Sequence, residues 1–283
     1  MTQLDQFESV FRAASKAVFE YERIAVNAVL VVTDQEGDAA ARTGEQVAKF
    51  LQVLDGADFR VVGANEFSTV PDLLDLVEHH RPDLICTYRH LHSESWRWPY
   101  TLGEYVDVLT QVTTTPVVVL PHPESMRASD HALQHTRVVM AMTDHLTGDA
   151  QLVNYAVRLT EPRGKLFLTH IEDEATFERY VDTISRIPSI ETDDARRGIS
   201  ERLLKEPEDY IQSCRAVLKK EGLEFDVVSI VRMGQHIREY QNLIGEHQVD
   251  LLVFNTKDEG QLAMHGLGYP LAIELRQIPL LML

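Results

Sequence analysis

The sequence predicts an α/β protein composed of two doubly wound, parallel-sheet domains in tandem. Short apolar runs alternate with segments of helical periodicity along the chain, and this alternation is typical of parallel strands joined by right-handed helical crossovers. The pattern also restarts, because an apolar run followed by Thr-Asp occurs at Thr33-Asp34 and again at Thr143-Asp144. The 283 residues are enough for about two domains of ordinary size.

The first half is expected to contain four strands. Apolar residues at helical spacing over 3–22 predict an N-terminal helix, which is assigned to residues 1–25. Short apolar runs then predict strands at 29–32, 59–62, 83–87 and 116–120, separated by helices at 38–54, 70–80 and 103–113. Gly56 suits the end of the first of these helices and Pro71 the start of the second.

The second half has room for five strands. They are predicted at 138–142, 165–169, 225–231, 250–254 and 279–283. Helices are predicted at 149–160, 174–186, 193–205, 207–221, 235–247 and 267–276, with Pro207 in the first turn of a helix of its own. The resulting units are residues 26–122 and 136–283, and the Pro- and Ser-containing stretch 123–135 between them is interpreted as a linker.

Both halves also close in a similar way. Asp83 at the start of one apolar run is echoed by Asp250, and Gly103 before a helix is echoed by Gly268. Each of these helices is followed by a final apolar strand, 117–120 in the first half and 280–283 in the second. An apolar strand at a sheet edge is a template for pairing. We therefore expect these strands to pair either within one chain, as a pseudo-dimer, or between two copies.

Composition excludes several classes of protein. Lys and Arg total 27 against 44 Asp and Glu, a net charge of −17, which argues against binding to nucleic acid or to an anionic membrane. The two cysteines cannot form a disulfide framework or a cysteine-based zinc site. Neither a signal peptide nor an apolar run of membrane-spanning length is recognisable, so a cytoplasmic location is expected.

The second half resembles a universal stress protein domain, and the whole chain resembles a tandem of two, with the first one shortened. The resemblance lies in the apolar strand before Asp144, the strand that begins at Asp250, the loop 255–260, Leu267-Gly268 and the C-terminal strand. It implies a Rossmann-like, adenine nucleotide alpha hydrolase-like fold, a role in stress response and dimerisation through the last strand. Many members of the family bind ATP through a Gly-x2-Gly-x9-Gly-Ser/Thr loop.

This sequence keeps the spacing of that loop and changes its chemistry. The four positions are occupied by Asn255, Asp258, Gly268 and Tyr269. Asn and Asp tolerate left-handed backbone, but the Asp258 carboxylate would repel a phosphate by about 4 kcal/mol per charge pair at ~4 Å. Bridging Mg²⁺ would cancel part of this repulsion. In the first half Glu104 stands at the position of the capping hydroxyl, which argues against ATP there.

Ligands of open α/β sheets bind at the carboxyl ends of the strands. The candidate ligand cavity therefore comprises residues near those ends in the second half: Asp144, His170, Asn255, Thr256, Asp258, His265, Gly268 and Tyr269. For Asp34 and Asp144 an Asx turn or a helix N-cap is the competing interpretation. His170 either adjoins the ligand or is satisfied by the backbone.

Two other groups of residues were weighed. His131 and His135, next to Asp130, have the spacing of metal ligands on a helix, but no further ligand is evident and a solvated linker is expected. The loop with His90, His92, Trp96, Trp98 and Tyr100 either closes a small-molecule pocket, or covers apolar surface or meets a partner. No metal site and no catalytic residue is assigned.

Three functions follow from these patterns. The first is a regulatory stress protein without robust catalysis, which binds a small ligand or an unidentified protein partner. The second is an ATP-binding sensor, with Mg²⁺ and slow hydrolysis, that uses the second half. The third, an enzyme of the wider nucleotide-binding α/β group, has no assignable nucleophile or base.

Overall fold

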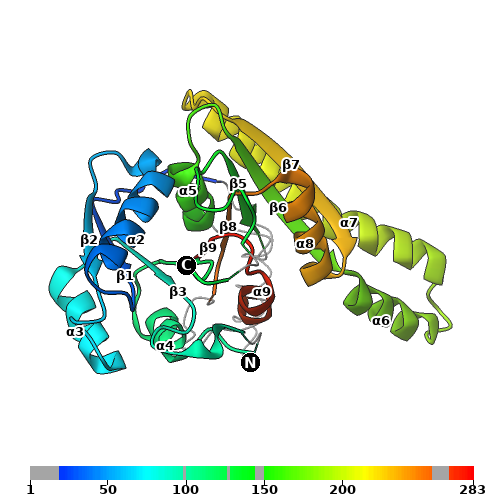
Figure 1. Ribbon diagram of the computed structural model, residues 1–283. Coiled ribbons are helices and arrows are strands. Elements are labelled where there is room, and N and C mark those ends of the chain that lie inside the picture. The colour runs from blue at the N-terminus through cyan, green and yellow to red at the C-terminus, as the bar shows by residue number, and fades with distance from the viewer. Residues whose placement is uncertain (1–18, 98–99, 126–127, 144–149, 257–267) are drawn as a thin grey trace, which may run out of the picture.

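The computed structural model describes residues 19–97, 100–125, 128–143, 150–256 and 268–283. Within these ranges nine strands form one sheet in the order β2-β1-β3-β4-β9-β8-β5-β6-β7 (Figure 1). The strands of the first half are β1 (Ala28–Val32), β2 (Asp58–Val62), β3 (Leu84–Tyr88) and β4 (Val117–Leu120). Those of the second half are β5 (Val138–Met142), β6 (Lys165–Asp173), β7 (Asp226–Gly234), β8 (Leu251–Phe254) and β9 (Leu280–Met282). The α/β class predicted from the sequence is confirmed.

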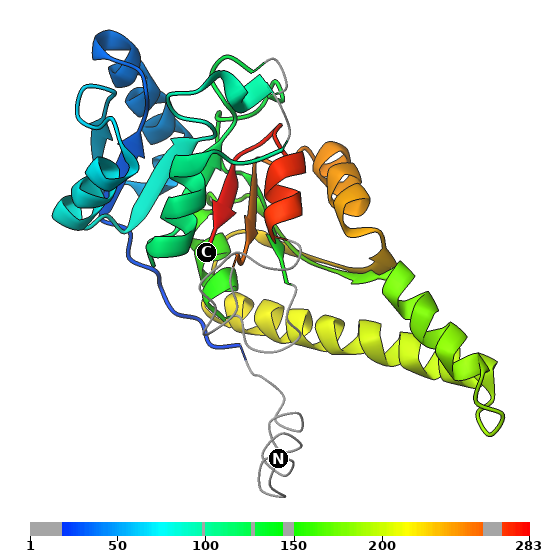
Figure 2. The same cartoon turned by 90° about the horizontal axis from the view of Figure 1, so that it is seen from below.

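Helices connect the strands and cover the sheet (Figures 1 and 2). In the first half they are α2 (Gly37–Phe50), the short η1 (Gln52–Leu54), α3 (Val70–His80), η2 (Glu94–Arg97) and α4 (Glu104–Val112). In the second half they are α5 (Ala150–Leu159), α6 (Glu174–Ser185), α7 (Thr192–Lys220), α8 (His236–His247) and α9 (Gly268–Glu274). One buried apolar cluster runs through both halves, so burial of apolar surface stabilises them together.

The two halves meet at β4 and β9. Every other neighbouring pair of strands is parallel, whereas β4 and β9 are antiparallel, with Val118 opposite Leu281. The final strand is paired with β8 on its other edge. The intramolecular alternative for the two final apolar strands is therefore correct, and β9 has no free edge for a second copy. Homodimerisation through another surface stays a prediction.

The echoed aspartates have the same structural role. The Asp83 carboxylate accepts hydrogen bonds from the backbone N–H groups of Asn27 and Ala28, at 2.7 and 3.0 Å. The Asp250 carboxylate accepts one from the N–H of Val138 at 2.8 Å. Each aspartate thus anchors the start of the first strand of its half, where the ladder leaves backbone donors unsatisfied.

The N-terminal helix is not seen where the chain is described. Residues 1–18 lie outside the described ranges, and residues 19–27 are not helical. Phe19 is instead buried in the core, and Asn154 of α5 bonds the backbone of Glu20 and Glu22 at 3.3 and 3.2 Å. Packing and hydrogen bonds to the second half therefore override the helical spacing of residues 19–22.

The predicted break at Pro207 is wrong. The helices predicted at 193–205 and 207–221 are one 29-residue helix, α7, with Pro207 buried inside it. Together with α6, α7 extends past the sheet as an arm (Figures 1 and 2). The arm is held together by buried Phe177 and Val181 of α6 and by the Arg196–Glu178 ion pair. Side-chain packing thus maintains α7 through a residue that interrupts its hydrogen-bond ladder.

Replacing Pro207 with Ala should stabilise the protein slightly. Removing a proline from inside a helix gains about 3 kcal/mol relative to alanine. Two terms oppose this gain: the loss of two buried methylenes costs about 1.6 kcal/mol, and the greater conformational freedom of the unfolded chain costs about 0.4–1 kcal/mol. We expect the free energy of unfolding in urea to rise by up to about 1 kcal/mol. The exposed Lys205→Ala change in the same helix is the control, expected within about 0.5 kcal/mol of the parent. A loss of stability in Pro207→Ala would show that the ring's packing dominates.

Strands β6 and β7 are longer than predicted. They pair with each other over nine residues, from Lys165–Asp226 to Asp173–Gly234. The added residues include Glu172, Asp173 and Arg232, which carry no apolar signal.

None of the helices in the described ranges combines the length and the apolar character needed to cross a bilayer.

Candidate functional site

The candidate site is the edge of the sheet where the parallel strands end. In the second half β5 lies between β8 and β6, so the connections leave in opposite directions on its two sides, which is where open α/β sheets bind ligands. Asp144, Asp258 and His265 lie outside the described residues. The other five predicted residues are His170, Asn255, Thr256, Gly268 and Tyr269.

His170 is held from both sides of its ring. It is 5% exposed, its Nδ1 lies 2.6 Å from the carbonyl oxygen of Thr143, and its Nε2 lies 3.3 Å from the carboxylate of Glu172. Both nitrogens therefore face oxygen atoms of the protein. This geometry matches the backbone-satisfied interpretation of His170, with Glu172 as an additional partner.

Thr256 closes the end of the sheet. Its hydroxyl and its backbone N–H both donate to the carbonyl oxygen of Leu283, at 2.7 and 2.9 Å. The N–H of Leu283 in turn donates to the carbonyl of Phe254 at 3.1 Å. The threonine thus extends the pairing of β8 and β9 and uses its hydroxyl within the protein.

The start of α9 packs against the end of β8. A Cβ atom added to Gly268 would lie 3.3 Å from the carbonyl oxygen of Asn255, a distance that real Cβ atoms seldom tolerate without a shift. The glycine predicted from the loop spacing is therefore explained by close backbone approach. Asn255 itself is half-buried.

Tyr269 faces the first half of the molecule. Its side chain lies close enough to Asp107 of α4 for the two groups to affect each other's pKa. Burial raises the pKa of Asp107, and the tyrosine partly offsets this rise. Burial and the carboxylate raise the pKa of Tyr269. Tyr269 therefore links α9 to α4 across the junction of the halves, and its role as a ligand contact stays a prediction.

The corresponding edge of the first half is occupied by its own side chains. The buried hydroxyl of Tyr88 lies 2.8 Å from Oγ1 of Thr33 and donates a short hydrogen bond to Asp34. The other carboxylate oxygen of Asp34 accepts the N–H of His92 at 2.8 Å. Burial, together with Asp34, raises the pKa of Tyr88. This network satisfies the polar groups at the end of β1.

Asp34 is therefore not the N-cap of α2. That helix is preceded by Glu36, which makes no side-chain cap, and the turn after β1 is made by Thr33, whose Oγ1 accepts the N–H of Gln35 at 3.2 Å. The N-cap interpretation fails because the long-range tyrosine supplies a stronger partner than the local backbone.

The aromatic loop lies partly outside the described residues, which exclude Trp98. Its His92 ring contacts Phe67 and Tyr105, with centroids 4.9 and 5.6 Å apart. Phe67 is buried, so His92 covers apolar side chains, as one of the two interpretations expected. Tyr100 is 72% exposed.

The two histidines of the linker bind the second half. Nε2 of His131 lies 3.0 Å from the carbonyl oxygen of Val249, and Nδ1 of His135 lies 2.9 Å from the Asp250 carboxylate. The expectation of a solvated linker is thus wrong for these residues, because they tie residues 131–135 to the start of β8. Among the described residues no group of three potential metal ligands is found.

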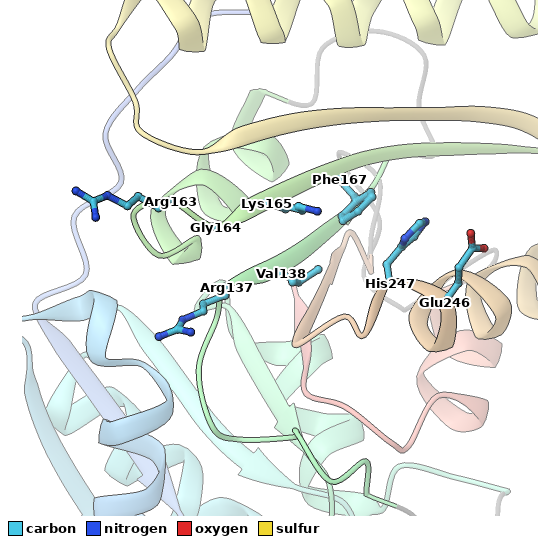
Figure 3. A pocket seen from close by; sticks show the side chains of 8 residues that line it. All are labelled: Arg137, Val138, Arg163, Gly164, Lys165, Phe167, Glu246 and His247. Atoms are coloured by element: carbon cyan, nitrogen blue, oxygen red, sulfur yellow. The ribbon is translucent and has the colours of Figure 1, made fainter.

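A cavity of about 350 Å³ lies at the opposite edge of the sheet, where β5 and β6 begin (Figure 3). The rings of Phe167 and His247 are stacked beside the cavity, with their centroids 4.5 Å apart. Its rim carries both signs of charge, from Lys165 and Glu246 among others. None of the five described candidate residues lines it.

No protein-family model matches the sequence, and no curated protein matches it. Among solved structures, a functionally unknown protein from Pseudomonas aeruginosa PAO1 aligns over 92% of both chains, with 12% identity and a TM-score of 0.51. A protein provisionally identified as a universal stress protein from Pseudomonas aeruginosa UCBPP-PA14 aligns over 92% of this chain and 93% of its own, with 12% identity and a TM-score of 0.50.

The chain therefore has a universal stress protein-like fold. A universal stress protein from Archaeoglobus fulgidus DSM 4304 also aligns, over 91% of this chain and 86% of its own, with 13% identity and a TM-score of 0.46. At such identities the likeness concerns the fold alone.

Sequence reasoning missed the residues that dominate the first-half edge. The predicted strand ends at residue 87, and the sequence patterns assign no role to Tyr88, Arg89 or His122. One signal was present, because a tyrosine, an arginine and a histidine follow one another where a buried apolar strand ends. Only the pairing of β3 with β1 and β4 shows which groups they meet.

Proposed function

We propose that this chain is a universal stress protein-like regulatory protein that acts by binding a small ligand or a protein partner, without catalysis. One observation carries the proposal: the side-chain hydroxyls of Tyr88 and Thr256, which lie at the ends of β3 and β8, are both engaged within the protein. The Tyr88 hydroxyl binds Thr33 and Asp34, and the Thr256 hydroxyl binds Leu283. These hydrogen bonds hold the strand ends together, which gives the two hydroxyls a structural role.

The loop chemistry supports the same function. Asp258 places a negative charge where the loop of ATP-binding relatives would approach phosphate. Tyr269, at the position of the short hydroxyl, is engaged with Asp107 of the first half. An ATP-binding function would require both residues to change their roles.

The alternative is an ATP-binding sensor that uses residues 136–283 with Mg²⁺ and slow hydrolysis. The close approach of Gly268 to the Asn255 carbonyl favours it, because a tight backbone at this position is what a phosphate-binding loop requires.

Thermal unfolding with millimolar Mg-ATP separates the two. We expect no change in the melting temperature of the wild-type protein and a saturable increase for the Asp258→Gly, Tyr269→Ser double variant. A ligand at 100 times its dissociation constant adds about 2.7 kcal/mol to stability, which is readily measured. The control is Tyr180→Ser on the exposed face of the arm. Stabilisation of the wild type by Mg-ATP, with slow release of phosphate, would establish the alternative instead.

A further inference from the structure

Cationic and imidazole side chains gather where the two halves join. Arg89 and His90 follow β3, His122 follows β4, and Arg276 precedes β9. Tyr88 is in register with Leu120, and Val119 with Leu280. The three segments therefore leave the sheet side by side. The rings of Tyr88 and His122, with centroids 5.0 Å apart, agree with this placement.

Both guanidinium groups converge on the last turn of α9. Arg89 is 3% exposed, and its Nη2 donates to the carbonyl oxygens of Ala272 and Leu275. Arg276 is 7% exposed, and its Nε donates to the carbonyl of Ile273 at 2.9 Å. Helix-end carbonyls suit cations, but they leave the Nε of Arg89 buried without a partner among the described residues.

Within the described residues, the charge on Arg89 has no opposite charge beside it. Burial, with a smaller effect of Arg276, lowers the pKa of Arg89 to about 9, so the side chain is still protonated at neutral pH. It forms no ion pair within the described part of the chain. A buried charge of this kind is costly unless a counter-charge compensates it.

His90 adds an acceptor next to this donor. Its ring is 4% exposed, and its Nε2 is buried without a hydrogen-bond partner among the described residues. Burial lowers the pKa of His90, assisted by Arg276, Arg89 and His122, whereas the backbone of Thr101 raises it. A proton on Nδ1 would leave Nε2 as the acceptor of the ring. The neutral ring thus leaves the lone pair of Nε2 available to a hydrogen-bond donor.

Gly103 holds the chain tightly over His90. The glycine has a φ of 92°, and a Cβ on it would lie 2.8 Å from the backbone N and Cα atoms of His90. His90 itself is in the left-handed region with a φ of 60°, and its N–H donates to the carbonyl of Leu102 at 3.1 Å. The imidazole is therefore fixed in place by its backbone.

The acidic group near this cluster is already engaged. Asp34 is bound by the Tyr88 hydroxyl and the His92 N–H. Its charge acts on His122, where it partly offsets the effect of burial, which lowers the pKa of that histidine to about 4. Asp34 does not ion-pair with Arg89.

We propose that Arg89, His90 and Arg276, beside His122, bind a phosphate-type oxyanion at the junction of the two halves. The Nε–H of Arg89 donates to one oxygen of the anion, Arg276 contributes positive charge, and His90 Nε2 accepts the remaining P–OH proton of a hydrogen phosphate. This site lies where the two halves join. It is distinct from the ligand cavity predicted in the second half, and it does not depend on the proposed function.

Titration of the wild-type protein with inorganic phosphate, by calorimetry and phosphorus NMR at neutral pH, tests the site. We expect saturable binding to one site, with sulfate binding more weakly because it has no proton to give to His90. Arg89→Gln and His90→Gln should each weaken phosphate binding by about 10- to 100-fold, the effect of one charge-assisted hydrogen bond. The exposed Arg42→Gln variant should bind as the wild type does.

Because Arg89 also caps α9, circular dichroism and the melting temperature of each variant accompany the titration. His90→Gln keeps a polar group and leaves that cap intact. Tighter binding of a nucleoside monophosphate than of inorganic phosphate would identify the oxyanion as part of a larger ligand, whereas equal or weaker binding would identify free phosphate. The proposal is overturned if wild-type protein shows no saturable binding, or if neither variant at positions 89 and 90 weakens it.

Discussion

Leu281→Asp is expected to prevent stable folding of the full chain. Leu281 is buried in β9, paired with Val118 of β4 on one edge and with Val253 of β8 on the other. Truncating a buried leucine costs about 2–5 kcal/mol, and placing a carboxylate there adds the cost of a buried unpaired charge. A total of at least about 5 kcal/mol is comparable with the whole stability of an ordinary domain.

The measurement is urea unfolding together with size-exclusion chromatography. Leu281→Met preserves volume and should cost less than about 1.5 kcal/mol. Val112→Asp, on an exposed position of α4, introduces the same charge without burial and should leave the free energy of unfolding nearly unchanged. If Leu281→Asp kept the parent's melting temperature and hydrodynamic size, the β4–β9 junction would not hold the halves together.

Asp250→Ala should lower the free energy of unfolding by about 2–3 kcal/mol. The carboxylate is 1% exposed and accepts from the N–H of Val138 at 2.8 Å and from His135 at 2.9 Å. Removing it leaves a buried backbone donor without a partner, which costs about 1–3 kcal/mol. His135 also loses its hydrogen bond to the residue that precedes β8. Urea unfolding at neutral pH measures the loss.

Two further variants identify the cause. Asp250→Asn retains an oxygen for the Val138 N–H, and burial raises the pKa of Asp250, so a neutral group is tolerated there and the loss should be small. Asp83→Ala removes the equivalent carboxylate at a more exposed position and should cost about 1 kcal/mol. A larger loss at Asp83 than at Asp250 would contradict the assignment of the cost to burial.

The raised pKa of Asp250 also makes the free energy of unfolding depend on pH in a definite direction. A carboxyl group with a raised pKa in the folded state stabilises the protein most at low pH, and this contribution is lost as the pH rises through the folded-state pKa. Relative to Asp250→Asn, the wild type should therefore lose stability as the pH rises above the ordinary range of aspartate.

The carboxyl-edge residues were only partly predictable. Gly268 lies close to the carbonyl oxygen of Asn255, and a glycine at a close backbone approach leaves a local signal in the sequence. The partners of Tyr269 and His170 were not predictable. Tyr269 meets Asp107, which is remote in the sequence, and His170 meets a carboxylate only two residues away. The spacing of residues along the sequence does not determine which group a side chain contacts in the fold.

The sequence by itself determined the alternation of strands and helices and the equivalence of Asp83 and Asp250, because burial on both faces of a sheet requires short apolar runs and each first strand needs the same anchor. Only the tertiary structure decided that β4 and β9 join the halves within one chain, that α7 continues through Pro207, and that Arg89 and Arg276 meet at the end of α9. These features depend on contacts between residues far apart in the chain, whose energies outweigh local propensity and leave no periodic trace in the sequence.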